Sequence, residues 1–429
     1  MEISQSPPPV EAVPARPASL FNRNFLLLWQ GQAVSRLGNQ AFAVAMMFWV
    51  MEKTGSASVM GLLMTFSMLP GVLLGPVGGT FADRHSRIPI LVVCDVISGL
   101  GVLALAFLMM GMPDAVDVIL PVLFVVAVLG GVIQAFFMPA IAASIPDLVA
   151  PERLAAANSL NQFSNQASLL IGQAAGGILY NTLGAPLLFL IDGLSYLFSG
   201  ASAMFIRLPP RPRPQGEEKQ PVFRTYLRET AEGFRYVWQR TGLRSFMLAA
   251  SFLNFLIMPV MVLFPFYVSL YLREGSEWYG FLMAGMSSGA VAGFVLAGVL
   301  KLHGAARLRG LLVCMLLMPS LFGILGFVRV PALAVGVVFL AGASMGMVNV
   351  YLATMIQAST PSEIRGRVLG LLGTLGGALM PIGMALGGVV GDLTGKNVPL
   401  IYAVCTGAAV LLVLGFSTQR NFRDFLANA

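Results

Sequence analysis

Charged residues are scarce in this chain: Asp, Glu, Lys and Arg make up 10% of its 429 residues, whereas a soluble globular domain carries about 25%. Hydrophobic residues make up 57%. So few charges cannot cover a water-facing surface, which excludes a soluble globular enzyme. The apolar residues form runs of about 20 rather than alternating segments of about ten, which excludes a transmembrane β-barrel. The composition predicts a polytopic α-helical membrane protein.

Cysteine and histidine are also scarce. Cys94, Cys314 and Cys405 are odd in number, lie far apart and form no CxxC pair, so neither a disulfide framework nor a zinc site is indicated. The two histidines, His85 and His303, lie in predicted loops without a partner at ligand spacing. We therefore expect no metal, no cofactor and no catalytic residues, and we expect the protein not to be an enzyme.

The apolar runs predict twelve membrane-spanning helices in two sets of six. The first set covers 25–51, 59–81, 90–112, 118–140, 158–181 and 186–206. The second set covers 245–272, 278–300, 309–328, 331–354, 368–391 and 398–416. The chain then divides into a disordered tail (1–24), an N-terminal six-helix bundle (25–206), a connector (207–244), a C-terminal six-helix bundle (245–416) and a second tail (417–429).

Lys and Arg are distributed unevenly between the two sides of the membrane. Of the 26 basic residues, Lys53, Arg273, Arg329 and Lys396 lie on one side and Arg36 lies inside the first span. All the others lie on the side of the termini, which the positive-inside rule places in the cytoplasm. The net charge of +7 therefore reflects cytoplasmic loops and gives no reason to expect a nucleic-acid partner. No apolar h-region precedes the first span, so we expect that span to direct insertion without a cleaved signal.

The two sets of helices repeat one another. A shift of 211 positions aligns Ile171–Gly177 with Ile382–Gly388, and both sets have the same sidedness, which predicts parallel repeats about an axis normal to the membrane. Glycines spaced by four recur in every third helix, where backbones can approach closely. We expect these glycine stripes to form the seam along which the bundles slide. They are Gly71, Gly75 and Gly79; Gly172 and Gly176; Gly285, Gly289 and Gly293; and Gly383, Gly387 and Gly391.

The clearest motif lies between the second and third spans. Gly79-Thr80-Phe81-Ala82-Asp83-Arg84-His85-Ser86-Arg87 matches GxxxD(R/K)xxR, the core of the signature loop of the major facilitator superfamily. The stretches Leu28–Gly38, Ile145–Leu154 and Arg365–Val368 resemble the branch of this family that contains macrolide-efflux and enterobactin-exporter-like transporters. The resemblance covers about residues 20–416. It implies the twelve-helix facilitator fold and a bacterial inner-membrane location.

The signature loop predicts a gate. Asp83 can accept hydrogen bonds from helix N-termini or from cytoplasmic arginines when the inner side is closed. The resemblance implies that Asp83 and Arg87 stabilise the outward-facing state, and we assign Gly79, Asp83, Arg84 and Arg87 to this gating loop. The alternative is an ordinary charged loop.

Three charged residues fall several positions inside predicted spans, where a charge costs about 2.5–3.5 kcal/mol at the helix centre. Arg36 lies near the middle of the first span, and Asp95 and Asp192 lie in the third and sixth. We take all three as candidates for proton coupling, because a buried carboxyl can bind and release a proton. The alternative for both acids is a structural role. Many relatives carry an acid near the position of Asn39, which cannot titrate.

Polar and Met residues on the first, fourth, seventh and tenth spans are candidates for lining a substrate cavity, because the resemblance places these helices around it. Gln32, Arg36 and Gln40 form a line at helical spacing with Asn39 beside it, either lining the cavity or forming a buried hydrogen-bond hub. The 24 Met residues suit a loosely selective apolar pocket, although Met at helical spacing also suits a plain core. The candidates are Gln32, Arg36, Asn39, Gln40, Gln134, Met138, Asn254, Met258, Met261, Met345 and Asn349.

These observations predict a secondary active transporter that exports an amphipathic or hydrophobic small molecule, drug-like or siderophore-like, by proton antiport and alternating access. The expected partners are the small-molecule substrate, protons and membrane lipids, and the expected state is monomeric. One alternative is an uncoupled facilitator or a lipid or lysolipid flippase on the same fold. A more remote alternative is a membrane scaffold or sensor that transports nothing.

Overall fold

The computed structural model describes residues 19–207, 234–235, 237–239, 241–300, 302, 304–359, 370 and 373–419. These residues are helical and contain no strand. Ten helical segments in this part of the chain are long and apolar enough to cross a membrane. Arg365–Val368, Lys301, His303 and most of the predicted tails and connector lie outside the described residues.

The N-terminal bundle consists of α1 (Arg23–Thr54), α2 (Ala57–Arg84), α3 (Arg87–Gly111), α4 (Val116–Leu148), η1 (Pro151–Arg153) and α5 (Leu154–Met204). Gly184 interrupts α5 with a φ of 73°, a left-handed conformation that glycine adopts without strain. The break separates a first part of α5 (154–183) from a second part (185–204), as the sequence predicts. Counting α5 as two segments and adding α1 to the ten would give the twelve predicted spans. The number of spans, the cytoplasmic location of the termini and the domain boundaries all stay predictions.

The C-terminal bundle consists of α7 (Thr241–Val262), α8 (Phe264–Phe266), η2 (Tyr267–Leu272), α9 (Ser276–Leu300), α10 (Gly304–Leu325), α11 (Pro331–Ser359), α13 (Met380–Leu393) and α14 (Val398–Thr418). The segments α7, α8 and η2 together correspond to a single predicted helix. Pro259 and Pro265 lie in this stretch, and each lacks the backbone N–H that a continuous helix needs, which accounts for its irregular course.

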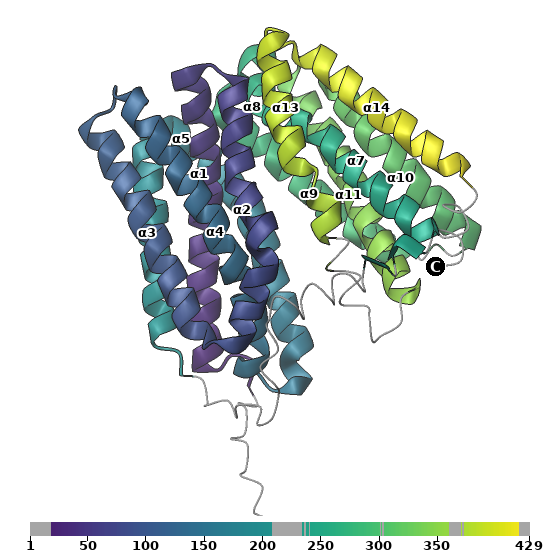
Figure 1. Cartoon of the computed structure of the whole chain (residues 1–429). Coiled ribbons are helices and arrows are strands. Elements are labelled where there is room, and N and C mark those ends of the chain that lie inside the picture. The colour runs from purple at the N-terminus through teal and green to yellow at the C-terminus, as the bar shows by residue number, and fades with distance from the viewer. Residues whose placement is uncertain are drawn as a thin grey trace, which may run out of the picture.

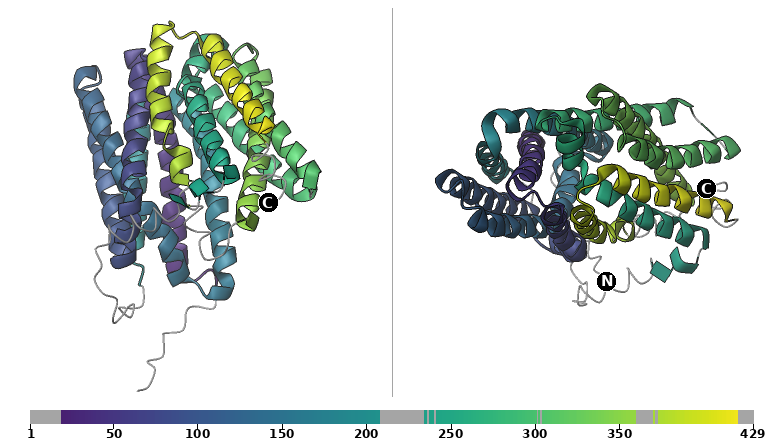
Figure 2. Two further views of the ribbon diagram at one scale, coloured as in Figure 1. Left: turned by 45° about the vertical axis from the view of Figure 1, so that its right-hand side comes forward. Right: turned by 90° about the horizontal axis from the view of Figure 1, so that it is seen from above.

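The two bundles lie side by side and touch at one end (Figures 1 and 2). We call this the closed end; it contains the turns at 55–56 and 394–397. The opposite, open end contains the turns at 85–86 and 149–150, and the ribbons of the two bundles diverge toward it (Figure 1). Contact between the bundles is made mainly by α5 with α9 and by α2 with α13.

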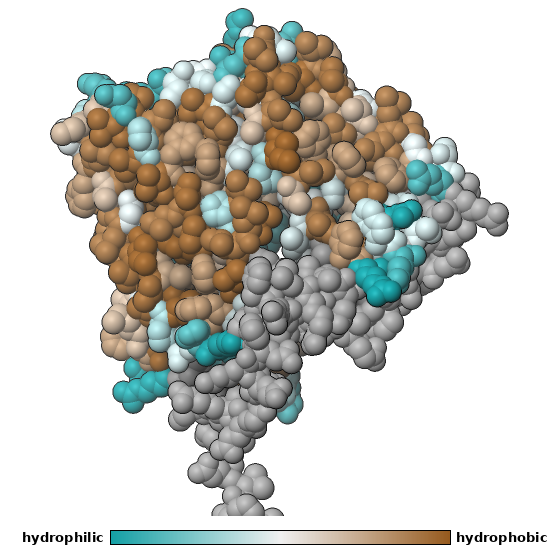
Figure 3. Space-filling view, in the orientation of Figure 1, coloured by the Kyte–Doolittle hydropathy of each residue, from teal (hydrophilic) through white to brown (hydrophobic). Residues whose placement is uncertain are grey.

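On the face that Figure 3 shows, apolar side chains cover most of the surface of both bundles, and hydrophilic residues gather near the two ends. Large apolar residues such as Phe107, Val125 and Leu411 are at least 60% exposed. In water this surface would be unfavourable, whereas in a bilayer it contacts the hydrocarbon. The surface therefore agrees with a protein embedded in a membrane.

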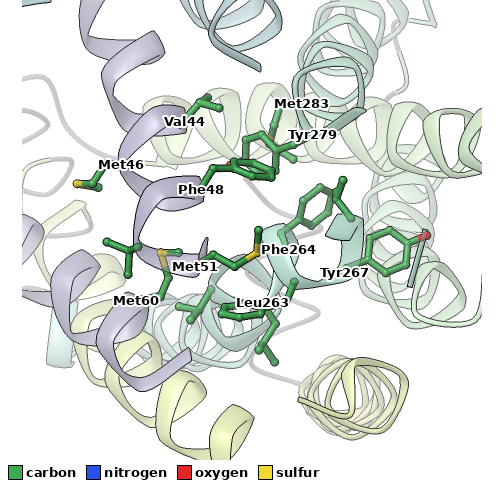
Figure 4. Packing of buried hydrophobic residues seen from close by; sticks show 14 of the residues in the cluster. Val44, Met46, Phe48, Met51, Met60, Leu263, Phe264, Tyr267, Tyr279 and Met283 are labelled. Atoms are coloured by element: carbon green, nitrogen blue, oxygen red, sulfur yellow. The ribbon is translucent and has the colours of Figure 1, made fainter. Parts of the chain in front are cut away.

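An apolar cluster seals the closed end (Figure 4). It joins Phe48 on α1 and Met60 on α2 to Leu263, Phe264 and Tyr279 of the C-terminal bundle. The Tyr279 ring lies 5.5 Å from the Phe48 ring and 5.7 Å from the Phe264 ring, in edge-to-face geometry. Such contacts add to the apolar area that the closed end buries.

Most glycines of the predicted stripes pack inside their own bundle, contrary to the sequence-based expectation, and only Gly391 of α13 among those described meets the other bundle, at Ala57 of α2. Gly289 and Gly293 of α9 lie against the backbone of α11 in the same bundle, Gly176 of α5 lies against α1, and Gly387 of α13 lies against Pro259 of α7. The four predicted helices do carry the seam, but mainly through glycines outside the stripes. These are Gly61 and Gly388 where α2 meets α13, and Gly177 and Gly280 where α5 meets α9. Four-residue spacing identifies one face of a helix, and here that face packs inside its own bundle.

We expect Gly388→Leu to separate the bundles at the closed end, because its new side chain would enter the α2–α13 contact. Gly289→Leu is the matched control: it overpacks the α9–α11 contact and should cost about 1–3 kcal/mol of stability. Thermal unfolding in detergent and the distance between spin labels at positions 53 and 273 measure the two effects. A longer label distance for Gly289→Leu, with none for Gly388→Leu, would contradict this assignment.

Candidate transport site and gates

Arg36 lies near the middle of α1 and is half-buried. Its guanidinium donates to two oxygens of Asn161 on the first part of α5: the backbone carbonyl at 3.2 Å and the side-chain Oδ1 at 2.9 Å. No carboxylate pairs with Arg36 in the part of the chain that the structure describes. A cation at this depth in a span therefore has neutral partners, which leaves its charge uncompensated.

The polar residues predicted to form a line on α1 contact both parts of α5. Arg36 and Gln40 face the first part, because Gln173 Nε2 donates to Gln40 Oε1 at 3.3 Å. Gln32 and Asn39 face the second part: Gln32 Nε2 donates to Ser199 Oγ at 3.2 Å, and Asn39 Nδ2 donates to the Tyr196 hydroxyl at 2.6 Å. Gln32 is buried, so its geometry suits a structural hydrogen bond, whereas Arg36 and Gln40 keep partial exposure.

Asp95 on α3 and Asp192 on the second part of α5 are almost completely buried. Asp192 Oδ1 accepts a hydrogen bond from Ser195 Oγ at 3.4 Å. The Oδ2 atom of each acid has no hydrogen-bond partner among the described residues. The structure pairs neither acid with Arg36, which bonds to Asn161 on the other side of α1.

The remaining cavity candidates occupy varied surroundings. Asn254 on α7 donates from Nδ2 to the Gly376 carbonyl at 3.0 Å, and Met258 is buried in the main apolar cluster. The others range from half-buried to exposed: Met261 and Met345 are half-buried, and Gln134, Met138 and Asn349 are exposed. Their role in substrate binding stays a prediction.

The signature loop lies at the open end. Asp83 and Arg84 end α2 and are exposed, and Asp83 makes no hydrogen bond or ion pair within the described part of the chain. Arg87, by contrast, is buried at the start of α3. It pairs with Asp147 of α4, with 2.6 Å between Nη1 and Oδ2, and donates to the Ala143 carbonyl. Sequence reasoning missed this pairing, although Asp147 is the first acid in the Ile145–Leu154 stretch.

Asp392 at the closed end was also missed. Its carboxylate accepts hydrogen bonds from Ser56 Oγ at 2.6 Å and from the backbone N–H groups of Ala57 and Ser58 at 2.9 and 2.8 Å. It thereby joins α13 to the first turn of α2 in the other bundle. Nothing in the local pattern shows which helix the Asp392 side chain meets, so the sequence alone assigns it no role at the closed end.

The chain belongs to the Major Facilitator Superfamily, whose family model matches residues 28–384. It is 28% identical over 377 residues to macrolide efflux protein A of Streptococcus pyogenes, covering 87% of this chain and 90% of the relative. It is 25% identical over 382 residues to the multidrug efflux pump Tap of Mycolicibacterium fortuitum, again covering 87% and 90%. The predicted family and branch are confirmed, and the protein is a membrane transporter rather than an enzyme.

Solved structures confirm the fold. A bacterial homologue of the iron transporter ferroportin in an inward-facing state matches with a TM-score of 0.69 and 19% identity, covering 94% of this chain and 100% of the other. A D-xylose–proton symporter matches with a TM-score of 0.70 and 15% identity, covering 92% and 97%. At these identities the likeness establishes the helical architecture alone.

We expect Asp147→Asn to lower the stability of the protein by about 3 kcal/mol, because it removes the carboxylate charge that lies 2.6 Å from the buried Arg87 guanidinium. Asp83→Asn is the matched control at an exposed acid that has no partner among the described residues, and it should change stability by less than about 0.5 kcal/mol. Thermal unfolding of both variants in the same detergent compares them. Equal melting temperatures would show that the Arg87–Asp147 pair contributes little.

Proposed function

We propose that this protein exports an amphipathic or hydrophobic small molecule from the cytoplasm in exchange for protons, by alternating access. The single observation that carries the proposal is the arrangement of two bundles that meet at one end and diverge at the other (Figure 1). Its efflux relatives support the direction and the broad substrate class, since their names specify macrolides and multiple drugs.

The distribution of basic residues supports an inward-facing assignment for this conformation. Lys53, Arg273, Arg329 and Lys396, the basic residues predicted on the outer side, belong to segments at the closed end. Arg84 and Arg153, on the predicted cytoplasmic side, belong to segments at the open end. With this orientation, the substrate would enter between the diverging bundles from the cytoplasm.

Asp95 and Asp192 are the proposed proton carriers. Each is buried with one oxygen lacking a partner, and an unpaired ionised carboxylate in such a place costs several kcal/mol. A proton bound to either acid would remove this cost, which is why we assign the proton to them. Release of the proton would require water to reach them in the other conformation. The proposed role of Arg36 in coupling is electrostatic, because an arginine places a positive charge near the middle of α1.

Transport into inverted membrane vesicles tests the proposed function. With a labelled macrolide and with ethidium as probes, we expect accumulation that an uncoupler of the proton gradient abolishes. Accumulation that withstands the uncoupler would favour the uncoupled facilitator. Movement of a fluorescent lysolipid in place of either probe would favour the flippase. No movement of any probe would favour the scaffold or sensor.

We expect Asp95→Asn and Asp192→Asn to reduce proton movement driven by the transported probe by at least about tenfold in proteoliposomes, because an amide cannot carry the proton. Probe exchange without net proton flow should persist in both variants. Asp114→Asn, at an exposed acid, is the control and should behave as wild type. Full coupling in both core variants would remove these acids from the mechanism.

A further inference from the structure

The Asp392 carboxylate occupies the N-terminus of a helix that belongs to the other bundle. The N–H groups of Ala57 and Ser58 are in the first turn of α2, where no intrahelical acceptor is available and the helix dipole favours a negative charge. Ser56, the N-cap of α2, donates its hydroxyl to the same carboxylate and accepts from the Val59 N–H. Both oxygens of Asp392 are therefore used in strong, charge-assisted hydrogen bonds.

The loop after α13 holds this carboxylate in place. Lys396 Nζ lies 3.4 Å from Asp392 Oδ1 on the same turn. The Tyr271 hydroxyl donates to the Lys396 carbonyl at 3.2 Å and so ties the loop to η2. One helical turn before Asp392, Gly388 lies against the backbone of Ala57. This close approach of α13 to α2 is what brings the carboxylate within reach of the α2 N-terminus.

The sequence around Asp392 has the spacing of the signature loop. Gly388, Asp392 and Lys396 follow a GxxxDxxxK pattern, and Gly79, Asp83 and Arg87 follow GxxxDxxxR. The two patterns lie at opposite ends of one antiparallel helix pair: Asp83 ends α2 at the open end, and Asp392 lies near the last residue of α13 at the closed end. In this conformation Asp392 is fully bonded, whereas Asp83 has no partner among the described residues.

We propose that Asp392 is a latch that holds the closed end shut and acts as the counterpart of the Asp83 loop at the opposite end of the α2–α13 pair. When the closed end opens, α2 moves away from α13 and the three hydrogen bonds break together. The strength of this latch then sets how much of the protein occupies the conformation described here. The inference rests on the proposed alternating-access function.

The contact between α5 and α9, the second seam between the bundles, has no counterpart of the Asp392 latch among the described residues. Asn181 on α5 occupies the position 211 residues before Asp392, and it donates from Nδ2 to Glu277 Oε2 on α9 at 3.2 Å. The acid of this pair, Glu277, lies in the first turn of α9 itself, and its partner from the other bundle is the neutral amide of Asn181. Among the described residues of this seam, no carboxylate from one bundle therefore binds the N-terminus of a helix in the other. Glu277 is therefore a matched control: an acid at the same end of the molecule, on the other seam.

Distances between spin labels on the full-length protein test the latch. Labels at positions 53 and 273 span the closed end, and labels at 153 and 419 span the open end; all four are exposed. Cys94, Cys314 and Cys405 are first replaced, and the background is checked for an unchanged melting temperature. We expect Asp392→Asn to increase several-fold the population with a long closed-end distance and to shorten the open-end distance. Ser56→Ala, which removes one hydrogen bond, should give a smaller shift in the same direction, and Glu277→Gln should give little.

The measurement needs no substrate, so its result is independent of whether the protein exports any probe. Wild-type distances in Asp392→Asn and Ser56→Ala would overturn the latch even if proton-coupled export is observed. An equal shift in Glu277→Gln would also overturn it, because the effect would then belong to any acid at the closed end. If Asp392→Asn does not fold, the comparison of Ser56→Ala with Glu277→Gln decides the question.

Discussion

The close contact of α2 with α13 and of α5 with α9 is the constraint on which the rest of this structure depends. Helices can approach this closely only where side chains are absent, and Gly61, Gly388, Gly177 and Gly280 provide those positions. In a bilayer the lipid is as apolar as the helices, so close packing and hydrogen bonding must hold the bundles together. The apolar cluster around Phe48 and Tyr279 and the hydrogen bonds of Asp392 both exist because these backbones meet.

The charged residues that the structure places within or between the spans are distributed unequally between the two bundles. Arg36, Asp95 and Asp192, the charges deep within the spans, all belong to the N-terminal bundle, where they face helices of that same bundle. The C-terminal bundle contributes Asp392, which acts across the interface instead. The charges within the spans thus lie in one bundle, and the hydrogen bonds of Asp392 join the two bundles near one end of the spans.

The acids at the two ends of the α2–α13 pair differ in their hydrogen bonding. Asp392 has its full set of partners, and Asp83 is exposed without one among the described residues. Meanwhile Arg87 of the same signature loop is engaged inside the N-terminal bundle with Asp147, so part of that loop is structural in this conformation. In the proposed mechanism, a rocking motion would exchange hydrogen bonds at one end for hydrogen bonds at the other, so that neither conformation loses them all.

Much of the architecture followed from one-dimensional patterns. Apolar runs located the helices, because a span must satisfy its own backbone hydrogen bonds over about 20 residues. The break at Gly184 was predicted between two spans, and the signature loop at Asp83 indicated the family that the comparisons confirm. The seam was assigned to the correct four helices, because their glycines recur at a fixed interval along the chain.

The sequence by itself thus determined the class of protein, the course of its spans and the helices that join its bundles. Only the tertiary structure decided that Gly387 packs on α7 while its neighbour Gly388 meets α2, that Arg36 bonds to Asn161, and that Asp392 reaches Ser56 across 336 positions of sequence. Periodicity specifies which residues share a face of a helix, but the partner of that face depends on how all the other helices pack. The sequence of a single helix does not specify that arrangement.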